Sequence, residues 1–428
     1  MLTYWRSISA RLHLRDSSML AGSNLAGQAL ALLALPFILR LYGPESYGAY
    51  SFLVSLAAVL TIAATLKLEV VLPALKFDSL ATRLASGLAL FIPLATLAIF
   101  TASLAITEFA SDSSSLSSTP VVFSLSLAAM VLFGSYFLLL RTLLIRLGKF
   151  RGVASMQIVR PVLMAGLAVI FALPLSGSGS GAGLVAATVV AGLASVAIGF
   201  QAVPLSRRRM LRPFRLRRNL AEILRNRNFL TVTSASQLIN QINLQAPILM
   251  ATLLFGAKEA GWIAIATRIT FFPATLIGTS LGAVLNSTVS RRHNQGDPIA
   301  REIAEPALFL LVAGIAGYTA LYFLVGPLIV PIVGPDWADA AATIRIYCLL
   351  GFGYFLISSI TFVPVLLRDN RFVIAWNTGR LLSLLAIAVY VYFAGTGYLE
   401  SVIAICVTGF VFLLIFFLRA VSKARKPR

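Results

Sequence analysis

Long apolar runs alternate with short polar segments along almost the whole chain. Twelve of these runs are long enough to cross a hydrocarbon core of about 30 Å as helices. They are residues 17–41, 48–75, 84–106, 120–140, 153–174, 182–203, 230–255, 261–285, 306–332, 342–366, 373–394 and 400–419. Lipid cannot satisfy free backbone groups, so helices are the expected spanning form. The pattern predicts an all-α integral membrane protein with twelve transmembrane helices.

Composition agrees with this prediction. Hydrophobic residues make up 59% of the chain and charged residues 12%, whereas a soluble domain carries about 25% charged residues. Of the 35 basic residues, 28 fall in polar segments on the same side as the N-terminus, and only Lys258 falls in a segment on the other side. The positive-inside rule therefore predicts that both termini are cytoplasmic. The net charge of +20 is then loop charge, and we expect no nucleic-acid partner.

The densest basic segment, residues 205–229, holds nine arginines and lies at the middle of the chain. It predicts three parts: an N-terminal six-helix lobe (1–204), a basic cytoplasmic linker (205–229), and a C-terminal six-helix lobe with a basic tail (230–428). The linker also has the composition to contact anionic lipid headgroups.

The two halves share an internal repeat. The segment LYGPESYG, which begins at Leu41, matches LFGAKEAG at an offset of 213 residues. A second match, at an offset of 220, pairs Gln157 with Asn377 and Arg160 with Arg380. Two halves of equal orientation predict lobes related by a pseudo-two-fold axis along the membrane normal.

Six basic residues fall inside the apolar runs, where a charge costs at least ~2.5–3.5 kcal/mol. They are Arg40, Lys67, Arg160, Arg268, Arg345 and Arg380. We predict that Arg160, Arg380 and Arg268 line a central cavity and bind an anionic group, with Arg160 and Arg380 facing each other. The alternative is that they anchor the helices at lipid headgroups, which we favour for Arg40 and Arg345.

Glu69 is the only acidic residue in an interior position of these runs. It is a candidate for coupling to a cation, either a proton or sodium, and the alternative is a structural charge partner. Lys67 is two residues away, which places the two groups on different faces of a helix, so we expect them not to pair.

Amide side chains cluster in the seventh run. Gln237, Asn240 and Gln241 lie near one face of a helix, and the repeat pairs Gln28 with Gln241. Amides bind sugar hydroxyls, but they also join helices in membranes. Both roles stay open. No catalytic, metal-binding or cofactor-binding motif stands in a credible context, so we expect neither an enzyme nor a metal or cofactor.

Four segments together resemble the polysaccharide transport family of oligosaccharide flippases, the Wzx type of the multidrug/oligosaccharidyl-lipid/polysaccharide exporter superfamily. They are ALPFILRLYGPESYGAYSF from Ala34, LKLEVVLP from Leu66, LRTLLIRLGKFRGVASMQIVRP from Leu140 and VGPDW from Val333. The resemblance extends over essentially the whole chain.

This resemblance implies a two-lobed transporter in the plasma (inner) membrane of a bacterium. Its cargo would be an oligosaccharide repeat unit, of O-antigen or exopolysaccharide, linked to undecaprenyl pyrophosphate. Membrane lipids, a coupling cation and the polysaccharide polymerase machinery are the other expected partners. Two alternatives stay open: a cation-coupled small-molecule exporter of the same superfamily, and a membrane polysaccharide polymerase or ligase. A polymerase or ligase would be expected to carry a large outside loop, which this sequence lacks.

Overall fold

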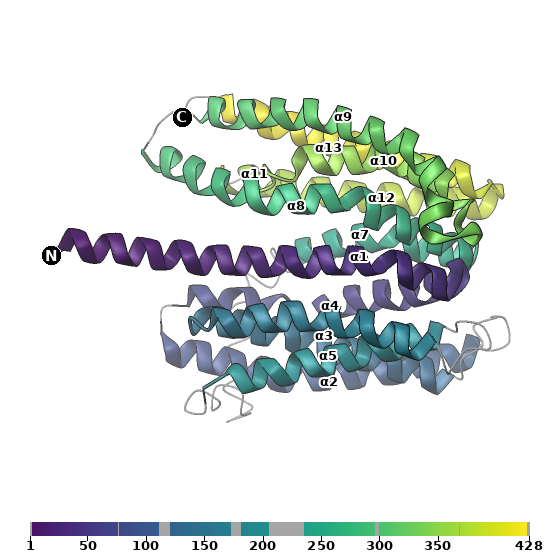
Figure 1. Cartoon of the computed structure of the whole chain (residues 1–428), viewed down its shortest axis with the longest axis horizontal. Helices are drawn as coiled ribbons and strands as arrows, with labels where there is room; N and C mark the ends of the chain where they lie inside the picture. Colours follow the sequence, from purple (N-terminus) through teal and green to yellow (C-terminus); the bar gives the residue numbers. More distant parts are fainter. Residues whose placement is uncertain are drawn as a thin grey trace. The chain divides into compact units, whose positions relative to one another are not determined.

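The computed structural model describes residues 2–75, 77–110, 120–172, 181–204, 235–295, 299–367 and 369–425, and regular structure in these residues is helical (Figure 1). The α-helices are α1 (Leu2–Thr65), α2 (Asp78–Ala110), α3 (Pro120–Arg146), α4 (Phe150–Ala172), α5 (Gly181–Ala202), α7 (Ala235–Leu254), α8 (Ala257–Gln295), α9 (Ala300–Val333), α10 (Ala340–Ile357), α11 (Val363–Leu366), α12 (Asn370–Ala394) and α13 (Tyr398–Arg425). Two short 3₁₀ helices are η1 (Leu68–Ala74) and η4 (Pro335–Trp337). The predicted linker, 205–229, lies outside the described residues.

The predicted all-helical membrane fold is confirmed. Ten helices in the described part of the chain are long and apolar enough to span a membrane. The first, Gly22–Thr65, has 44 residues, about twice what one crossing requires. It is kinked at Gly43 and so accounts for the first two predicted spans. The amide-rich α7 accounts for the remaining run, although it is not among the ten.

The chain divides into two compact units. Unit 1 comprises Met1–Leu41 and Leu53–Gln241, and unit 2 comprises Tyr42–Phe52 and Ile242–Arg428. The short segment after the kink in α1 therefore packs with the second half of the chain. The lobe boundaries 1–204, 205–229 and 230–428 stay a prediction.

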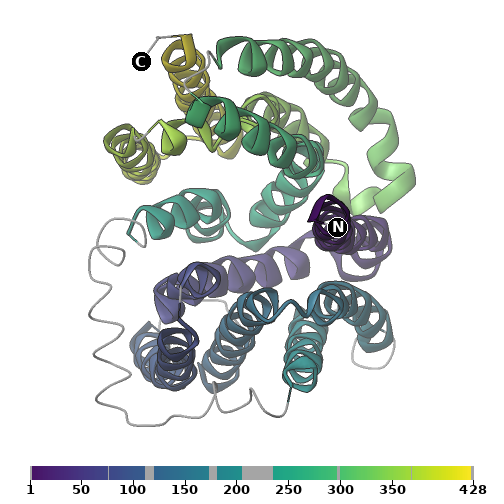
Figure 2. The ribbon, with the colours of Figure 1, turned by 90° about the vertical axis from the view of Figure 1, so that its left-hand side faces the viewer.

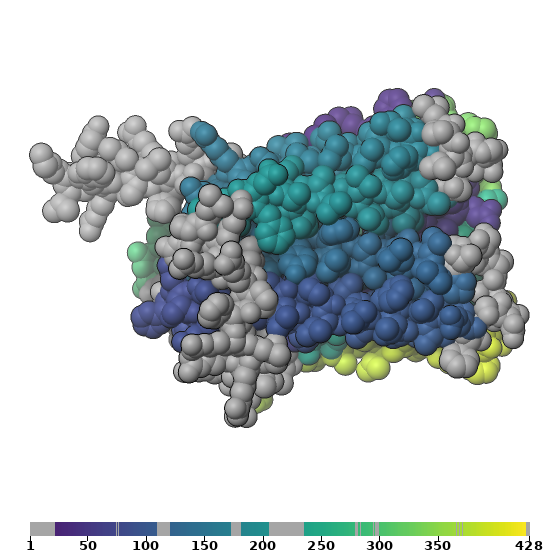
Figure 3. All heavy atoms as spheres, turned by 90° about the horizontal axis from the view of Figure 1, so that it is seen from below, coloured from purple at the N-terminus to yellow at the C-terminus, as the bar shows by residue number. Residues whose placement is uncertain are grey.

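Unit 1 is built around α3, which packs against α2, α4, α5 and η1. Its core consists of large aliphatic side chains, among them Leu88 on α2 and Leu140 on α3. Figure 3 shows the face of unit 1 formed by α2 and α5. Large apolar side chains are exposed on both helices, for example Leu97 and Leu193. Such a surface suits contact with lipid, where exposed apolar groups carry no cost.

Unit 2 is organised around α10, which packs against α8, α9 and α13. The end-on view of Figure 2 shows these helices, in green to yellow, around α10. Tyr318 of α9 joins two of them, because its hydroxyl donates a hydrogen bond to the carbonyl of Thr270 on α8 at 2.6 Å. A buried cluster of Leu310, Cys348 and Phe355 surrounds this tyrosine.

The two repeated glycine turns pack against each other inside unit 2. A Cβ atom on Gly48 would overlap the carbonyl oxygen of Ala257, and one on Gly261 would overlap that of Pro44. The repeat offset of 213 relates Pro44 to Ala257 and Gly48 to Gly261, so the same contact occurs twice in opposite directions. A reciprocal contact of this kind is what a two-fold relation between the turns produces.

The offset of 220 also has a structural counterpart. In unit 1, Ser23 on α1 donates a hydrogen bond to Oε1 of Gln157 on α4, at 2.7 Å. In unit 2, Asn243 on α7 donates to the backbone carbonyl of Asn377 on α12, at 2.9 Å. Each half thus ties its first helix to the same position of its fifth spanning helix, which supports the repeat inferred from sequence.

Candidate functional site

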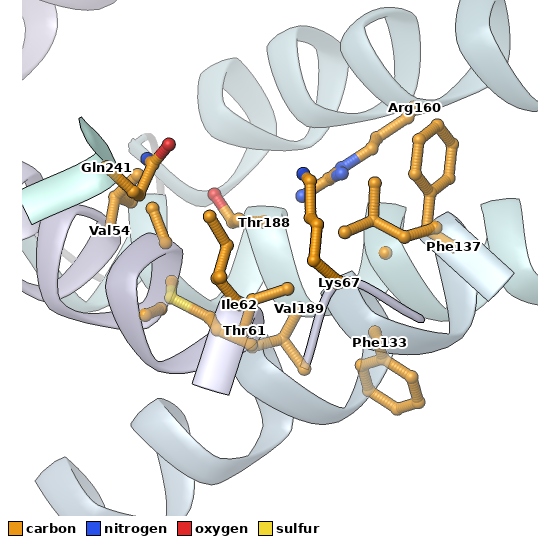
Figure 4. Close-up of a pocket in the computed structure, with 16 residues that line it drawn as sticks. Val54, Thr61, Ile62, Lys67, Phe133, Phe137, Arg160, Thr188, Val189 and Gln241 are labelled. Atoms are coloured by element: carbon orange, nitrogen blue, oxygen red, sulfur yellow. The ribbon is translucent and has the colours of Figure 1, made fainter. Parts of the chain in front are cut away.

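Unit 1 contains a cavity of about 310 Å³ between its helices (Figure 4). The chain after the kink in α1 contributes Thr61 and Lys67, and α3, α4 and α5 contribute Phe137, Arg160 and Thr188, respectively. Most of the remaining side chains that line the cavity are aliphatic. The few polar groups therefore lie in an apolar environment, where the low dielectric constant strengthens electrostatic interactions.

Two cationic side chains enter this cavity. Lys67 lies just beyond the end of α1, and Arg160 lies in the middle of α4. Their charged ends converge in the view of Figure 4. The Arg160 guanidinium carbon is 5.2 Å from the centre of the Phe137 ring, a cation–π contact that orients it. Among the described residues that line the cavity, none is an aspartate or a glutamate. This arrangement favours an anion.

The end of α1 determines where Lys67 points. The second predicted span was expected to continue to residue 75, but the α-helix ends at Thr65. Leu66 and Lys67 both adopt left-handed backbone angles, with φ of 50° and 57°. Such angles are uncommon for residues other than glycine and end the helical register. The chain then forms η1, and Lys67 turns toward the cavity.

The expectation that Lys67 and Glu69 do not pair is wrong. Their charged atoms lie 4.0 Å apart. The expectation assumed one regular helix, and the break at residues 66–67 removes that geometry. Glu69 is only 1% exposed and does not line the cavity. It lies between two spans, and burial raises the pKa of its carboxyl, although hydrogen bonds and the charge of Lys67 oppose that rise.

The predicted amide residues do not gather at one place. Gln241 lines the cavity of unit 1. Gln237 is exposed, whereas Asn240 and Gln28 are half-buried, and none of the three lines this cavity. Of the predicted site residues, the structure therefore brings together Lys67, Arg160 and Gln241.

In unit 2, Arg380 repeats the setting of Arg160 but is closed off. Its guanidinium carbon lies 5.2 Å from the centre of the Tyr354 ring on α10, the same distance as between Arg160 and Phe137 on α3. Trp376 adds a second ring at 6.0 Å. Arg380 is 4% exposed. The expectation that Arg160 and Arg380 face each other stays a prediction.

Arg268 occupies a separate place on α8. It is exposed, and its guanidinium carbon is 5.7 Å from the centre of the buried Tyr47 ring. Tyr47 belongs to the short segment that unit 2 takes from α1, and it also packs edge-on against Trp337. Arg268 therefore contacts the first of the two repeated turns, and its role in binding cargo stays a prediction.

Sequence reasoning did not single out the other residues of the cavity, among them Thr61, Phe137 and Thr188. A single threonine or phenylalanine in an apolar run has no distinguishing pattern. Phe137 had an indirect signal, because a buried arginine in a membrane needs an aromatic or polar partner nearby.

A family profile described as polysaccharide biosynthesis protein matches residues 13–291, well over half of the chain. No curated protein matches the sequence.

Solved structures that match this chain include transporters of the MOP superfamily. The lipid II flippase MurJ, in an inward closed conformation, has a TM-score of 0.70 at 14% identity, with 96% of this chain and 90% of MurJ covered. An inward-facing multidrug resistance transporter of the MATE family has a TM-score of 0.67 at 14% identity, over 93% of this chain and 94% of that one. A MOP-superfamily transporter from Pyrococcus furiosus, described as having a binding pocket of reverse polarity, has a TM-score of 0.58 at 14% identity, over 96% of both chains. At these identities the likeness establishes the fold.

Proposed function

Because the chain belongs to the family of polysaccharide biosynthesis proteins and has the fold of MOP-superfamily transporters, we propose that it is a flippase for a lipid-linked oligosaccharide. The cargo is a glycan repeat unit attached through pyrophosphate to undecaprenol. The protein carries this headgroup from the cytoplasmic to the periplasmic leaflet of a bacterial inner membrane. No covalent bond changes in this process, so the protein is a transporter and not an enzyme.

The pair of cationic groups in the cavity of unit 1 carries this proposal. Lys67 and Arg160 line one mostly apolar cavity together with Gln241 and Thr188. A guanidinium binds phosphate oxygens with two parallel hydrogen bonds, and an ammonium adds a mobile charge. The amide and the hydroxyl suit the sugar next to the pyrophosphate. The solved lipid II flippase is, by its name, a protein for a related kind of cargo.

Translocation follows from alternating access. The cavity binds the headgroup while it is open to the cytoplasm, the two halves rock, and the headgroup leaves on the other side. A potential that is negative inside favours outward movement of an anion by ~2.3 kcal/mol per charge per 100 mV. Glu69, which pairs with Lys67, is the candidate for coupling translocation to the movement of a proton or a sodium ion. Released repeat units then reach the polymerase machinery.

A cation-coupled exporter of small molecules is the second candidate, favoured only by the MATE fold. Cationic drugs need acidic partners, and the described lining of the cavity has two cations and no carboxylate. Loss of a polymerase or ligase would leave its substrate in a different leaflet from the one in which loss of a flippase leaves the cargo. One experiment can therefore distinguish a flippase, an exporter, and a polymerase or ligase.

That experiment is deletion of the gene, followed by analysis of the lipid-linked intermediates in each leaflet. A flippase predicts that single repeat units accumulate on the cytoplasmic leaflet and that the surface polymer is lost. Repeat units trapped in the periplasmic leaflet would identify a polymerase or ligase instead. Unchanged polymer together with drug sensitivity would identify an exporter.

A further inference from the structure

A second cavity, of about 460 Å³, lies in unit 2 between α8 and α9. Both helices pack against α10 and make few contacts with each other, and Figure 2 shows them as separate columns. Leu281 and Leu285 of α8 and Pro306 and Phe309 of α9 form apolar walls. Phe309 is 63% exposed, so this crevice is open at its side.

Charged groups stand at one end of the crevice. Arg292 of α8 and Glu302 of α9 form an ion pair at 2.7 Å that bridges the two helices. Within the first turns of α9, Arg301 and Glu305 form a second pair at 2.6 Å. Both glutamates line the crevice. The rim therefore offers two cations and two carboxylates above an apolar cleft.

Glu302 has an unfilled hydrogen-bonding position. Its side chain is 15% exposed, and Oε1 accepts the ion pair from Arg292. Its other oxygen, Oε2, is buried and has no hydrogen-bond partner among the described residues. A buried carboxylate oxygen without a donor costs free energy. Glu305, whose side chain is 64% exposed, offers the accessible carboxylate of the rim.

We propose that this crevice binds a zwitterionic phospholipid with a primary amine, a phosphatidylethanolamine. The ammonium lies against the carboxylates of Glu302 and Glu305, the phosphate lies against the arginines of the rim, and one acyl chain occupies the apolar cleft. A primary ammonium carries three N–H donors, like lysine. A choline headgroup has none and cannot donate a hydrogen bond to these carboxylates. A phosphate without an amine, including the pyrophosphate of the proposed cargo, would meet two carboxylates.

The site is distinct from the proposed cargo cavity, since neither Lys67 nor Arg160 lines it. Its occupant would fix the spacing of α8 and α9 at this end of unit 2. A ligand that binds only the folded protein stabilises it by mass action, so the lipid is expected to raise the melting temperature.

The test uses the full-length protein in nanodiscs that contain equal amounts of phosphatidylethanolamine and phosphatidylcholine, with retained lipids measured by native mass spectrometry. The wild type is expected to retain the ethanolamine lipid with about tenfold preference, which corresponds to ~1.4 kcal/mol. Glu302→Gln should remove the preference because a neutral amide is a weaker acceptor for an ammonium. Thr288→Phe, which leaves every charge in place, should lower total retention because it fills the crevice wall.

Glu400→Gln is the matched control. It makes the same change at an exposed residue in the first turn of α13, and it should keep the preference of the wild type. Equal retention of both lipids by the wild type, or an unchanged preference in Glu302→Gln, would overturn the proposal. A parallel set of nanodiscs contains phosphatidylethanolamine with an equal amount of phosphatidylglycerol, and is titrated with undecaprenyl phosphate. Preferential retention of phosphatidylglycerol, or displacement of the amine lipid by undecaprenyl phosphate, would also overturn the proposal and assign the crevice to an anionic lipid.

Discussion

Arg160→Ala is expected to abolish glycan export while the protein remains folded at normal levels. The guanidinium lines the cavity of unit 1 and is held over Phe137 at 5.2 Å. A hydrogen bond to a charged group contributes ~1.5–3 kcal/mol, so its loss should weaken pyrophosphate binding by about 10- to 150-fold. Arg160→Lys keeps the charge but loses the planar fork, and it should fall between the wild type and alanine.

Binding is measured by calorimetry on the purified full-length protein with inorganic pyrophosphate as the probe, and export by restoration of surface polysaccharide in the deletion strain. Arg151→Ala is the control. It lies on the same helix, is exposed, and stands nine residues earlier, which is ~13 Å along the axis. It should bind and export normally.

Two results would refute this reasoning. Full export by Arg160→Ala, at protein levels equal to those of the wild type, would remove Arg160 from the cargo site. An equal loss of binding in Arg160→Ala and Arg151→Ala would show that the probe responds to overall charge and not to the cavity.

Three further predictions concern stability, each measured by thermal unfolding of the purified protein. Arg380→Ala should destabilise the protein by about 2 kcal/mol, because a buried side chain stacked on Tyr354 and Trp376 is lost; lost export with an unchanged melting temperature would instead make Arg380 a binding residue. Burial raises the pKa of Glu69, so the native state favours the protonated carboxyl and loses stability as the pH rises through that pKa. Glu69→Gln should therefore gain stability relative to the wild type with rising pH, and a difference that is constant with pH would contradict this. Gly48→Ala should cost about 1–3 kcal/mol, because its Cβ would overlap the carbonyl of Ala257, whereas Gly166→Ala, with open space around it, should not destabilise.

The sequence was sufficient to predict the spanning helices and the repeat. The apolar runs indicate which segments of the chain can lie in lipid. The matched glycine turns indicate a close backbone contact that leaves no space for a side chain. The list of charges inside the runs already contained Lys67 and Arg160, two of the three predicted residues that line the cavity.

The break after Thr65 could not be predicted in the same way. Hydropathy does not change there, because the apolar run continues through η1. The backbone is left-handed at Leu66 and Lys67, and the chain beyond them makes tertiary contacts that a local pattern does not contain. Arg146, for example, donates hydrogen bonds to the carbonyls of Leu72 and Leu75 at 2.8 and 2.7 Å. A prediction based on one regular helix therefore placed Lys67 and Glu69 on different faces.

Two residues at equivalent positions of the repeat, Arg160 and Arg380, differ in their surroundings. Arg160 and Arg380 have the same aromatic contact, yet only Arg160 lines the cavity of unit 1. The residue four positions earlier accounts for part of the difference. In unit 2 it is Trp376, whose ring covers Arg380 and whose indole N–H donates to the carbonyl of Phe412 at 2.6 Å. In unit 1 the corresponding residue is Met156, which is fully buried and has no aromatic ring that could cover Arg160. Arg160 therefore lies beside a cavity, whereas Arg380 is enclosed within the protein. For this reason we expect anion binding at Arg160 and a structural role for Arg380.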